Sequence, residues 1–149
     1  MPRPIRELLS RYLTDHGRPW TKAEMDDALA GWIALFERQK MGKLRVTRKA
    51  DGVLVGRCGF GVYGPDDTPE IGYSLYPEHW GHGYAFEAAS ALADWYWRET
   101  TRDHFIGLAD VRNAKSLKVL RRLGGVYTHT GENDHGHLCE WFIFRRPSA

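Results

Sequence analysis

Apolar and polar residues follow two different periods along this chain, and the change of period separates helical from strand segments. In the first third the apolar residues recur every three or four positions, which predicts an amphipathic helix with one face in the core: Met25, Leu29, Trp32, Ile33 and Phe36. Thr21 and Glu24 form the spacing of a capping box, so this helix is predicted to begin at Thr21. A shorter pattern predicts an earlier helix over residues 5–13.

From Leu44 onward the period is two. The stretch LRVTRKADGVLVGRCGF predicts a hairpin of two strands, because Asp51-Gly52 between them accepts the positive φ of a tight turn. YGPDDTPE is predicted to be a loop. IGYSLY, residues 71–76, is predicted to be a further strand that ends at Pro77.

The middle of the chain predicts a strand, a helix and a second strand. A long helix is expected directly after Gly83, over YAFEAASALADWYWRE, and its inner face would hold Ala85, Ala89, Leu92 and Tyr96. HFIGLADV, residues 104–111, reads as a short apolar strand. A helix that joins two strands is the usual crossover between parallel strands, so these segments predict a βαβ unit.

The last third predicts one helix and two strands. NAKSLKVLRRLGG is amphipathic, with Gly124 or Gly125 as its C-terminal cap and three leucines turned inward: Leu117, Leu120 and Leu123. VYTHT and HLCEWFIF are predicted to be two closing strands.

Composition indicates one soluble domain over residues 1–149. Apolar residues make up 42% and charged residues 27%, and no apolar run approaches the ~20 residues of a membrane-spanning helix. The N-terminus lacks the pattern of a secretory signal, so we expect a cytoplasmic protein. The net charge of +2 is too small to indicate a nucleic-acid partner, but it suits a small anionic ligand.

Cysteines and histidines give no metal site. Cys58 and Cys139 lack the paired spacing of zinc ligands, and we expect both to be reduced. His135 and His137 lie in the turn-rich stretch GENDHGH, where solvated loop residues are more common than metal ligands.

The stretch EHWGHGYAFEA, residues 78–88, places two glycines between a strand and a helix. Free N–H groups and the positive end of the helix dipole favour an anion there, and Gly81 and Gly83 would let the main chain approach a phosphate closely. A GxG before a helix is common, so this spacing alone is weak evidence. The dinucleotide fingerprint fits poorly because Phe86 occupies its third glycine position, and the Lys-Ser/Thr pair of a P-loop is missing.

EIGYSLYPEHWGHGYAFEAASALADWYW followed by LADVRNAKSLKVLRRLGG resembles the GNAT superfamily of acyl-CoA N-acyltransferases, in particular its RimJ/RimL-like branch. The resemblance spans about residues 44–144. It implies an α+β fold with a mixed, mostly antiparallel sheet, helices on both faces, and a central βαβ unit around which the sheet splays. The first strand of relatives is expected to be missing, because only about ten residues precede the segment RYLTDHGRPW.

The resemblance implies an acetyl-CoA-dependent N-acetyltransferase and assigns residues to the cofactor. The family pattern Q/R-x-x-G-x-G/A maps onto residues 78–83 with an acidic residue, Glu78, in the first position. The glycine turn would hold the pyrophosphate through Trp80, Gly81, His82, Gly83, Tyr84 and Ala85. The main chain of Leu75 and Tyr76 would pair with the pantetheine arm. Asn113, from the family's N-x-x-S motif, would contact the cofactor or cap its helix, and both roles can hold together.

The same resemblance assigns the chemistry. Glu70 is similar to the carboxylate that relatives use as a base, directly or through water; the alternative is a glutamate at the strand edge facing solvent. The tyrosine acid of many relatives corresponds to Leu120 here, which leaves Ser116 as the nearest donor to the sulfur, or as a serine bonded within its own turn. The acceptor would be a primary amine, either a protein N-terminus or a small molecule. Four scattered aromatic residues either line the acceptor side of the site or belong to the core, and the core is the more common role: Trp20, Trp32, Tyr63 and Tyr73.

Two alternatives stay open at this point. The chain could be a non-catalytic acyl-CoA-binding or regulatory module, or a fragment that folds only within a larger assembly. A missing first strand would leave LRVT as a bare sheet edge, which predicts a homodimer through that edge, unless the start site is assigned too late.

Overall fold

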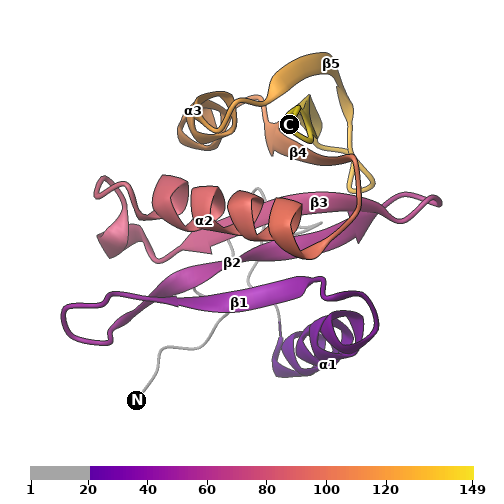
Figure 1. Ribbon diagram of the computed structural model, residues 1–149. Coiled ribbons are helices and arrows are strands. Elements are labelled where there is room, and N and C mark those ends of the chain that lie inside the picture. The colour runs from indigo at the N-terminus through magenta and orange to yellow at the C-terminus, as the bar shows by residue number, and fades with distance from the viewer. Residues whose placement is uncertain (1–20) are drawn as a thin grey trace.

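The computed structural model describes residues 21–149, which form a six-stranded sheet packed against helices (Figure 1). The elements in chain order are α1 (Lys22–Gln39), β1 (Gly42–Thr47), β2 (Leu54–Tyr63), β3 (Thr68–Leu75), the short 3-10 helix η2 (Pro77–His79), α2 (Tyr84–Glu99), β4 (His104–Asp110), α3 (Ala114–Arg122), β5 (Val126–Glu132) and β6 (Leu138–Arg145). The helix predicted over residues 5–13 lies outside the described residues.

The sheet is mixed, with strand order β1-β2-β3-β4-β6-β5. Its neighbours pair antiparallel except β3 and β4, which are parallel and are joined by α2. The antiparallel pairs stay in register over most of their length, whereas β3 and β4 are in register only where Glu70 faces Ile106. Figure 1 shows the resulting separation of β1, β2 and β3 from β4 and β5. The predicted βαβ unit and the splayed sheet are confirmed.

Helices cover both faces of the sheet. Alternate side chains of β2 point to opposite faces: Phe60 packs on Tyr96 of α2, while the guanidinium of Arg57 lies over the Trp32 ring of α1. On the α2 side, α3 packs on β4, where Leu120 lies next to Gly107. The buried core lies mainly between the sheet and these two helices: Cys58, Phe60, Ile71, Ala89, Tyr96, Phe105, Leu117, Leu120, Phe142 and Phe144.

Helix α1 begins as predicted and buries a different face. Thr21 is its N-cap, and both bonds of the capping box with Glu24 are present. Leu35 is the buried residue of the helix, whereas Leu29 and Ile33 are 48% and 53% exposed. The predicted inner face was therefore wrong at Leu29 and Ile33, because apolar spacing alone does not say which side of a broad stripe meets the sheet.

The hairpin is confirmed with a wider turn than predicted. Gly52 has φ of 71°, but Arg48 and Val53 pair through the main chain, so the loop between the strands is longer than Asp51-Gly52. The bidentate ion pair between Arg48 and Asp51 holds this loop.

Strand β3 begins three residues before the predicted strand. Thr68, Pro69 and Glu70 were predicted to be loop, but they pair with Tyr63, Val62 and Gly61 of β2. The proline is compatible with the strand because it occupies a position whose N–H is not needed by β2. As a result Glu70 lies inside β3 and not at its head.

The remaining helices match their predictions. Helix α2 starts at Tyr84 and buries Ala89 and Tyr96. Helix α3 buries Leu117 and Leu120, and the amides of Gly124 and Gly125 bond to the carbonyls of Arg121 and Leu120. This pair of bonds with Gly124 at positive φ is a Schellman cap.

Candidate functional site

The glycine turn lies at the carboxyl end of β3, directly before α2. Gly81 and Gly83 have φ of 82° and 79°, and the space where a side chain would stand is open at both. Gly83 is the N-cap of α2 and offers no side-chain bond, so the first amides of the helix lack a capping partner from that residue. Left-handed glycines before an uncapped helix form an anion-binding arrangement of main-chain N–H groups.

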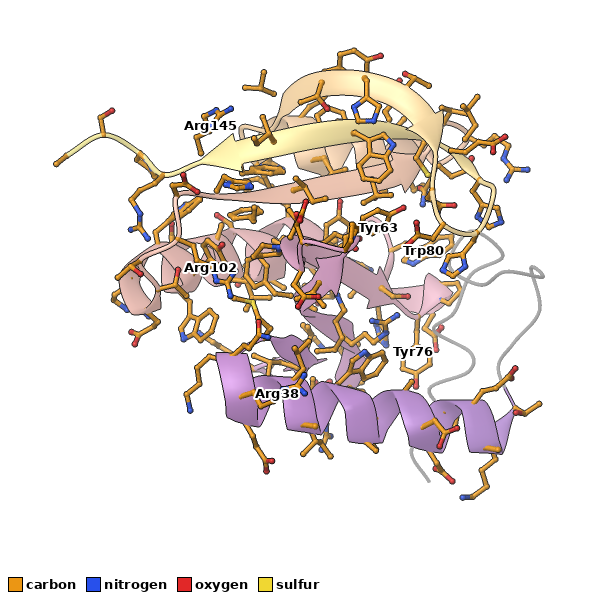
Figure 2. The ribbon with its side chains drawn as sticks, turned by 90° about the vertical axis from the view of Figure 1, so that its right-hand side faces the viewer. Arg38, Tyr63, Tyr76, Trp80, Arg102 and Arg145 are labelled. Atoms are coloured by element: carbon orange, nitrogen blue, oxygen red, sulfur yellow. The ribbon has the colours of Figure 1, made fainter. Side chains whose placement is uncertain are left out.

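Trp80 fixes this turn against the strand. Its indole N–H donates to the Leu75 carbonyl over 3.0 Å, and the Lys115 ammonium of α3 lies 4.8 Å from its ring centroid. Figure 2 shows Tyr76 and Trp80 at the end of the sheet opposite Arg102 and Arg145. The turn is therefore held where β3 and β4 diverge.

Cationic side chains surround the start of α2. The Arg122 guanidinium of α3 lies 3.9 Å from the centroid of the Phe86 ring. Asp51 raises the pKa of the Arg48 guanidinium in the hairpin loop, and Tyr84 at the start of α2 adds to this shift. Lys115 and Arg122 thus add positive charge around a helix end that already favours an anion.

The main chain at the end of β3 differs between the two residues predicted to meet the pantetheine arm. Tyr76 donates its N–H to Val55 and accepts from the His79 N–H. The Leu75 N–H points away from β2, toward the space between the diverging strands, because successive residues of an antiparallel strand alternate in direction. Of these two residues, only Leu75 therefore has a main-chain N–H that points toward the predicted place of the pantetheine arm. The Tyr76 side chain is buried.

Asn113 and Ser116 lie at the start of α3, facing β3. Asn113 is the N-cap, and its side-chain oxygen accepts from the Ser116 N–H over 3.2 Å. The Tyr73 hydroxyl of β3 lies 3.1 Å from both the Oγ and the carbonyl oxygen of Ser116. Burial raises the pKa of Tyr73 to about 12, so this hydroxyl stays protonated and can donate.

Tyr73 is the residue of this cluster that the sequence did not place. The sequence left Tyr73, like Trp32 and Tyr63, as a core residue or a candidate for the acceptor side, and the structure packs it against the core on the α3 face of the sheet. Tyr63 packs edge-on against Trp141, and its hydroxyl accepts from the Asp134 amide, which ties the β5–β6 loop to β2. Trp20 lies outside the described residues.

Glu70 occupies the last position at which β3 and β4 are in register, and its side chain is on the α1 face. Burial raises the pKa of this carboxyl; Asp134 adds to the shift, while Lys43 and Arg57 oppose it. A carboxylate with a raised pKa is a better proton acceptor than an ordinary one. Glu70 and the Tyr73–Ser116 pair thus lie on opposite faces of the sheet beside the point where it opens.

The described residues hold no candidate metal-ligating group and no candidate membrane-spanning helix. Residues 21–149 contain no group of three or more metal-ligating side chains. Across the same residues, no helix is both long and apolar enough to cross a bilayer. Cys58 and Cys139 are both buried and free in the structure.

Comparison with known proteins identifies the family. The family model for the acetyltransferase (GNAT) domain matches residues 5–126, so the chain belongs to the GNAT acetyltransferase family. Among curated relatives, the uncharacterized protein YkkB of Bacillus subtilis is 34% identical over 84 residues, which are 55% of this chain and 49% of that protein. The chain spans about half the length of the curated relatives it matches.

Solved structures share the fold. A GNAT-family acetyltransferase from Bordetella pertussis superimposes with a TM-score of 0.79 at 21% identity, covering 93% of this chain and 84% of that one. The ribosomal L7/L12 α-N-protein acetyltransferase RimL, solved in complex with coenzyme A, has a TM-score of 0.72 at 20% identity, covering 85% and 74%. The predicted resemblance to the RimJ/RimL-like branch is confirmed at the level of fold and family.

Proposed function

We propose that this protein is an N-acetyltransferase that moves an acetyl group from acetyl-CoA to a primary amine by direct attack on the thioester. The observation that carries the proposal is the opening of the sheet beyond Glu70 and Ile106, with the glycine turn at its mouth and ionisable groups on both faces. Family membership and the fold shared with a coenzyme A complex support it.

The glycine turn would hold the pyrophosphate of acetyl-CoA. Main-chain amides from Gly81 to Ala85 supply donors, the open space at both glycines leaves room, and Lys115 and Arg122 add positive charge. The Leu75 N–H would pair with the pantetheine arm, which would fill the gap between β3 and β4 as an extra strand does. Asn113 would then both cap α3 and contact the cofactor.

The proposed chemistry uses one group on each face. Glu70 takes a proton from the acceptor ammonium, and the free amine forms a bond to the carbonyl carbon of the thioester. When the carbon–sulfur bond breaks, the sulfur leaves with the electron pair and takes a proton from the Ser116 hydroxyl. The nitrogen loses its surplus proton in the same step, and a proton returns to Ser116 through solvent, so that the products are the amide, the thiol and the proton held by Glu70. Tyr73 is hydrogen-bonded to the Ser116 hydroxyl and orients it. Positioning supplies much of the acceleration, because a thiolate is already a good leaving group.

Thermal unfolding with acetyl-CoA, followed by thiol release over a panel of primary amines, tests this proposal. We expect acetyl-CoA to raise Tm and at least one amine to release coenzyme A. Stabilisation with no thiol release from any amine would favour the alternative of an acyl-CoA-binding or regulatory module. No stabilisation would contradict both. The amine acceptor and the cytoplasmic location stay predictions.

We also propose self-association through β1, which is the terminal strand of the sheet among the described residues. Leu44 of this strand is 45% exposed, and bare strand edges invite pairing with another chain. Analytical ultracentrifugation should detect a dimer that a proline in place of Val46 weakens, whereas a monomer at all concentrations would contradict the proposal.

A further inference from the structure

Three cationic side chains gather on the α1 face of the sheet, opposite the face that carries Tyr73 and Ser116. Lys43 and Arg45 come from β1 and Arg57 from β2. Arg45 and Arg57 are direct cross-strand partners, and Lys43 is the partner of Gly59 on the same face. Like charges directly opposite each other destabilise a sheet, so sheet stability does not explain why these cations lie together.

Arg57 is half-buried, and its donors are not all satisfied. Among the described residues, its Nε is buried and has no hydrogen-bond partner. The guanidinium lies over the Trp32 ring, 4.9 Å from the ring centroid. Burial lowers its pKa to about 10, with Cys58 and Glu70 opposing the shift. A buried donor without a partner is costly, and a guanidinium that carries such a donor is therefore suited to bind an anion.

Lys43 lies flat over the sheet toward β3. Its Nζ donates to the Gly59 carbonyl over 3.2 Å and stands 2.6 Å from where a side chain on Gly72 would begin. The absence of a side chain at Gly72 is what lets the ammonium reach this position. Burial lowers the pKa of Lys43 to about 8, and the nearby Arg57 contributes to the shift while Glu70 opposes it.

Glu70 lies on the same face, two residues before Gly72. Two residues of a strand span ~7 Å, so one small molecule can contact both Glu70 and the cations. Burial and the charge of Asp134 raise the pKa of Glu70, whereas the charges of Lys43 and Arg57 lower it. The α1 face is thus negative near Glu70 and positive beyond it.

We propose that this cationic cluster, Lys43, Arg45 and Arg57, binds a carboxylate on the acetyl acceptor, so that the acceptor is an amine with a carboxylate near it. The inference rests on the proposed acetyltransferase function. The acceptor's ammonium would meet Glu70, and its carboxylate would meet the Arg57 guanidinium and the Lys43 ammonium. A planar guanidinium matches a carboxylate with two parallel hydrogen bonds, which selects this anion by shape as well as by charge.

Matched acceptors test the inference. Thiol release is measured with free amino acids, with their primary amides, and with short peptide amides that carry aspartate or alanine at the N-terminus. We expect kcat/KM for the carboxylate member of each pair to exceed that of the uncharged member by roughly 10- to 100-fold, the range of a hydrogen bond to a charged group. The amide amine is the weaker base and is more often deprotonated, so such a preference cannot come from the amine. The free amino acids and the aspartyl peptides distinguish a small-molecule source of the carboxylate from a protein N-terminus.

Variants locate the preference. Arg57→Gln should reduce the preference to near unity, and Arg57→Lys should keep part of it because the charge remains without the fork. Arg102→Gln, at the far end of the sheet (Figure 2), is the matched control and should keep the preference. Because Arg57 has an unpaired buried donor and a like charge opposite, Arg57→Gln should leave Tm unchanged or raise it. A purely structural arginine would lower it.

The outcomes separate this inference from the proposed function. Equal kcat/KM within every pair, or a preference that survives Arg57→Gln, would overturn the carboxylate site while leaving the acetyltransferase intact. Thiol release from no amine would instead contradict the acetyltransferase. In that case thermal stabilisation by the amino acids decides: a shift that needs the carboxylate and is lost in Arg57→Gln supports the site, and its absence overturns it.

Discussion

The glycine turn before α2 and the charged face beside α1 are two parts of one candidate site, built in different ways. The turn is local: strand end, Trp80, both glycines and helix start follow one another within ten residues. The charged face is assembled from three strands, with Lys43, Arg57 and Glu70 brought together by the pairing of β1, β2 and β3. A local arrangement can be predicted from its motif, whereas a face of a sheet depends on register and therefore needs the structure.

The largest effect is expected at the glycine turn. Gly83→Val should abolish stabilisation by acetyl-CoA, because a side chain would enter the space where we place the pyrophosphate and strain the positive φ. For the wild type, ligand at 100 times Kd corresponds to about 2.7 kcal/mol of stabilisation, measured as a Tm shift.

Gly64→Val is the matched control for that experiment. Gly64 has φ of 72° and open space around it, but it lies in the β2–β3 turn. Both variants should lose a similar amount of stability, on the order of 1–2 kcal/mol from the left-handed backbone. If both variants also lost the acetyl-CoA shift equally, strain and not the phosphate site would explain the result.

The next effect is expected at Glu70 on the charged face. Glu70→Gln should lower kcat/KM by roughly 10²-fold or more, the scale of a general base, and leave acetyl-CoA binding unchanged. Since burial raises the pKa of Glu70 and the base must be ionised, wild-type kcat/KM should rise as pH increases through that raised pKa. Steady-state pH profiles should show this limb disappear in Glu70→Gln, while Glu132→Gln on β5 keeps it. If the limb survived in Glu70→Gln, another group would have to be the base.

A smaller effect is expected at the Tyr73–Ser116 pair. Ser116→Ala should lower kcat by roughly 10-fold if its hydroxyl donates to the departing sulfur, and Tyr73→Phe should lower it less because Tyr73 acts through Ser116. Since the two hydroxyls are in contact, the double variant should be no slower than Ser116→Ala alone. Additive losses in a double-mutant cycle would contradict a shared role.

The limits of prediction from the sequence follow the same division. The capping box at Thr21, the start of α2 at Tyr84 and the βαβ unit were all predicted correctly, because each depends on a few adjacent residues or on one helical period. The start of β3 was missed because Pro69 is tolerated only at its particular place in the register. Tyr73 was left as either a core residue or an acceptor-side residue and Arg57 was not singled out, since neither has a partner nearby in the sequence.

The smallest effect concerns stability and compares two carboxyls of the sheet, Glu70 on the charged face and Asp110 at the end of β4. Asp110 is buried and accepts three hydrogen bonds from Arg112, chiefly from its guanidinium, which lowers the pKa of Asp110. Its stabilisation is present above the unfolded-state pKa and is lost as pH falls through the lower folded pKa. Glu70 has the opposite sign, because its raised pKa gives stability that is present at low pH and lost as pH rises through the folded value.

At pH 7, therefore, Asp110→Asn should lower the free energy of unfolding by about 1 kcal/mol. This is the contribution of a hydrogen bond to a charged group, made smaller here because the Arg112 side chain is exposed to solvent. Glu70→Gln should raise it, since the ionised carboxylate no longer has to be buried. The difference between each variant and the wild type should shrink toward acid pH in urea unfolding series. If Glu70→Gln were less stable than the wild type at pH 7, Glu70 would be a structural member of the face, and its assignment as the base would lose the physical reason for its raised pKa.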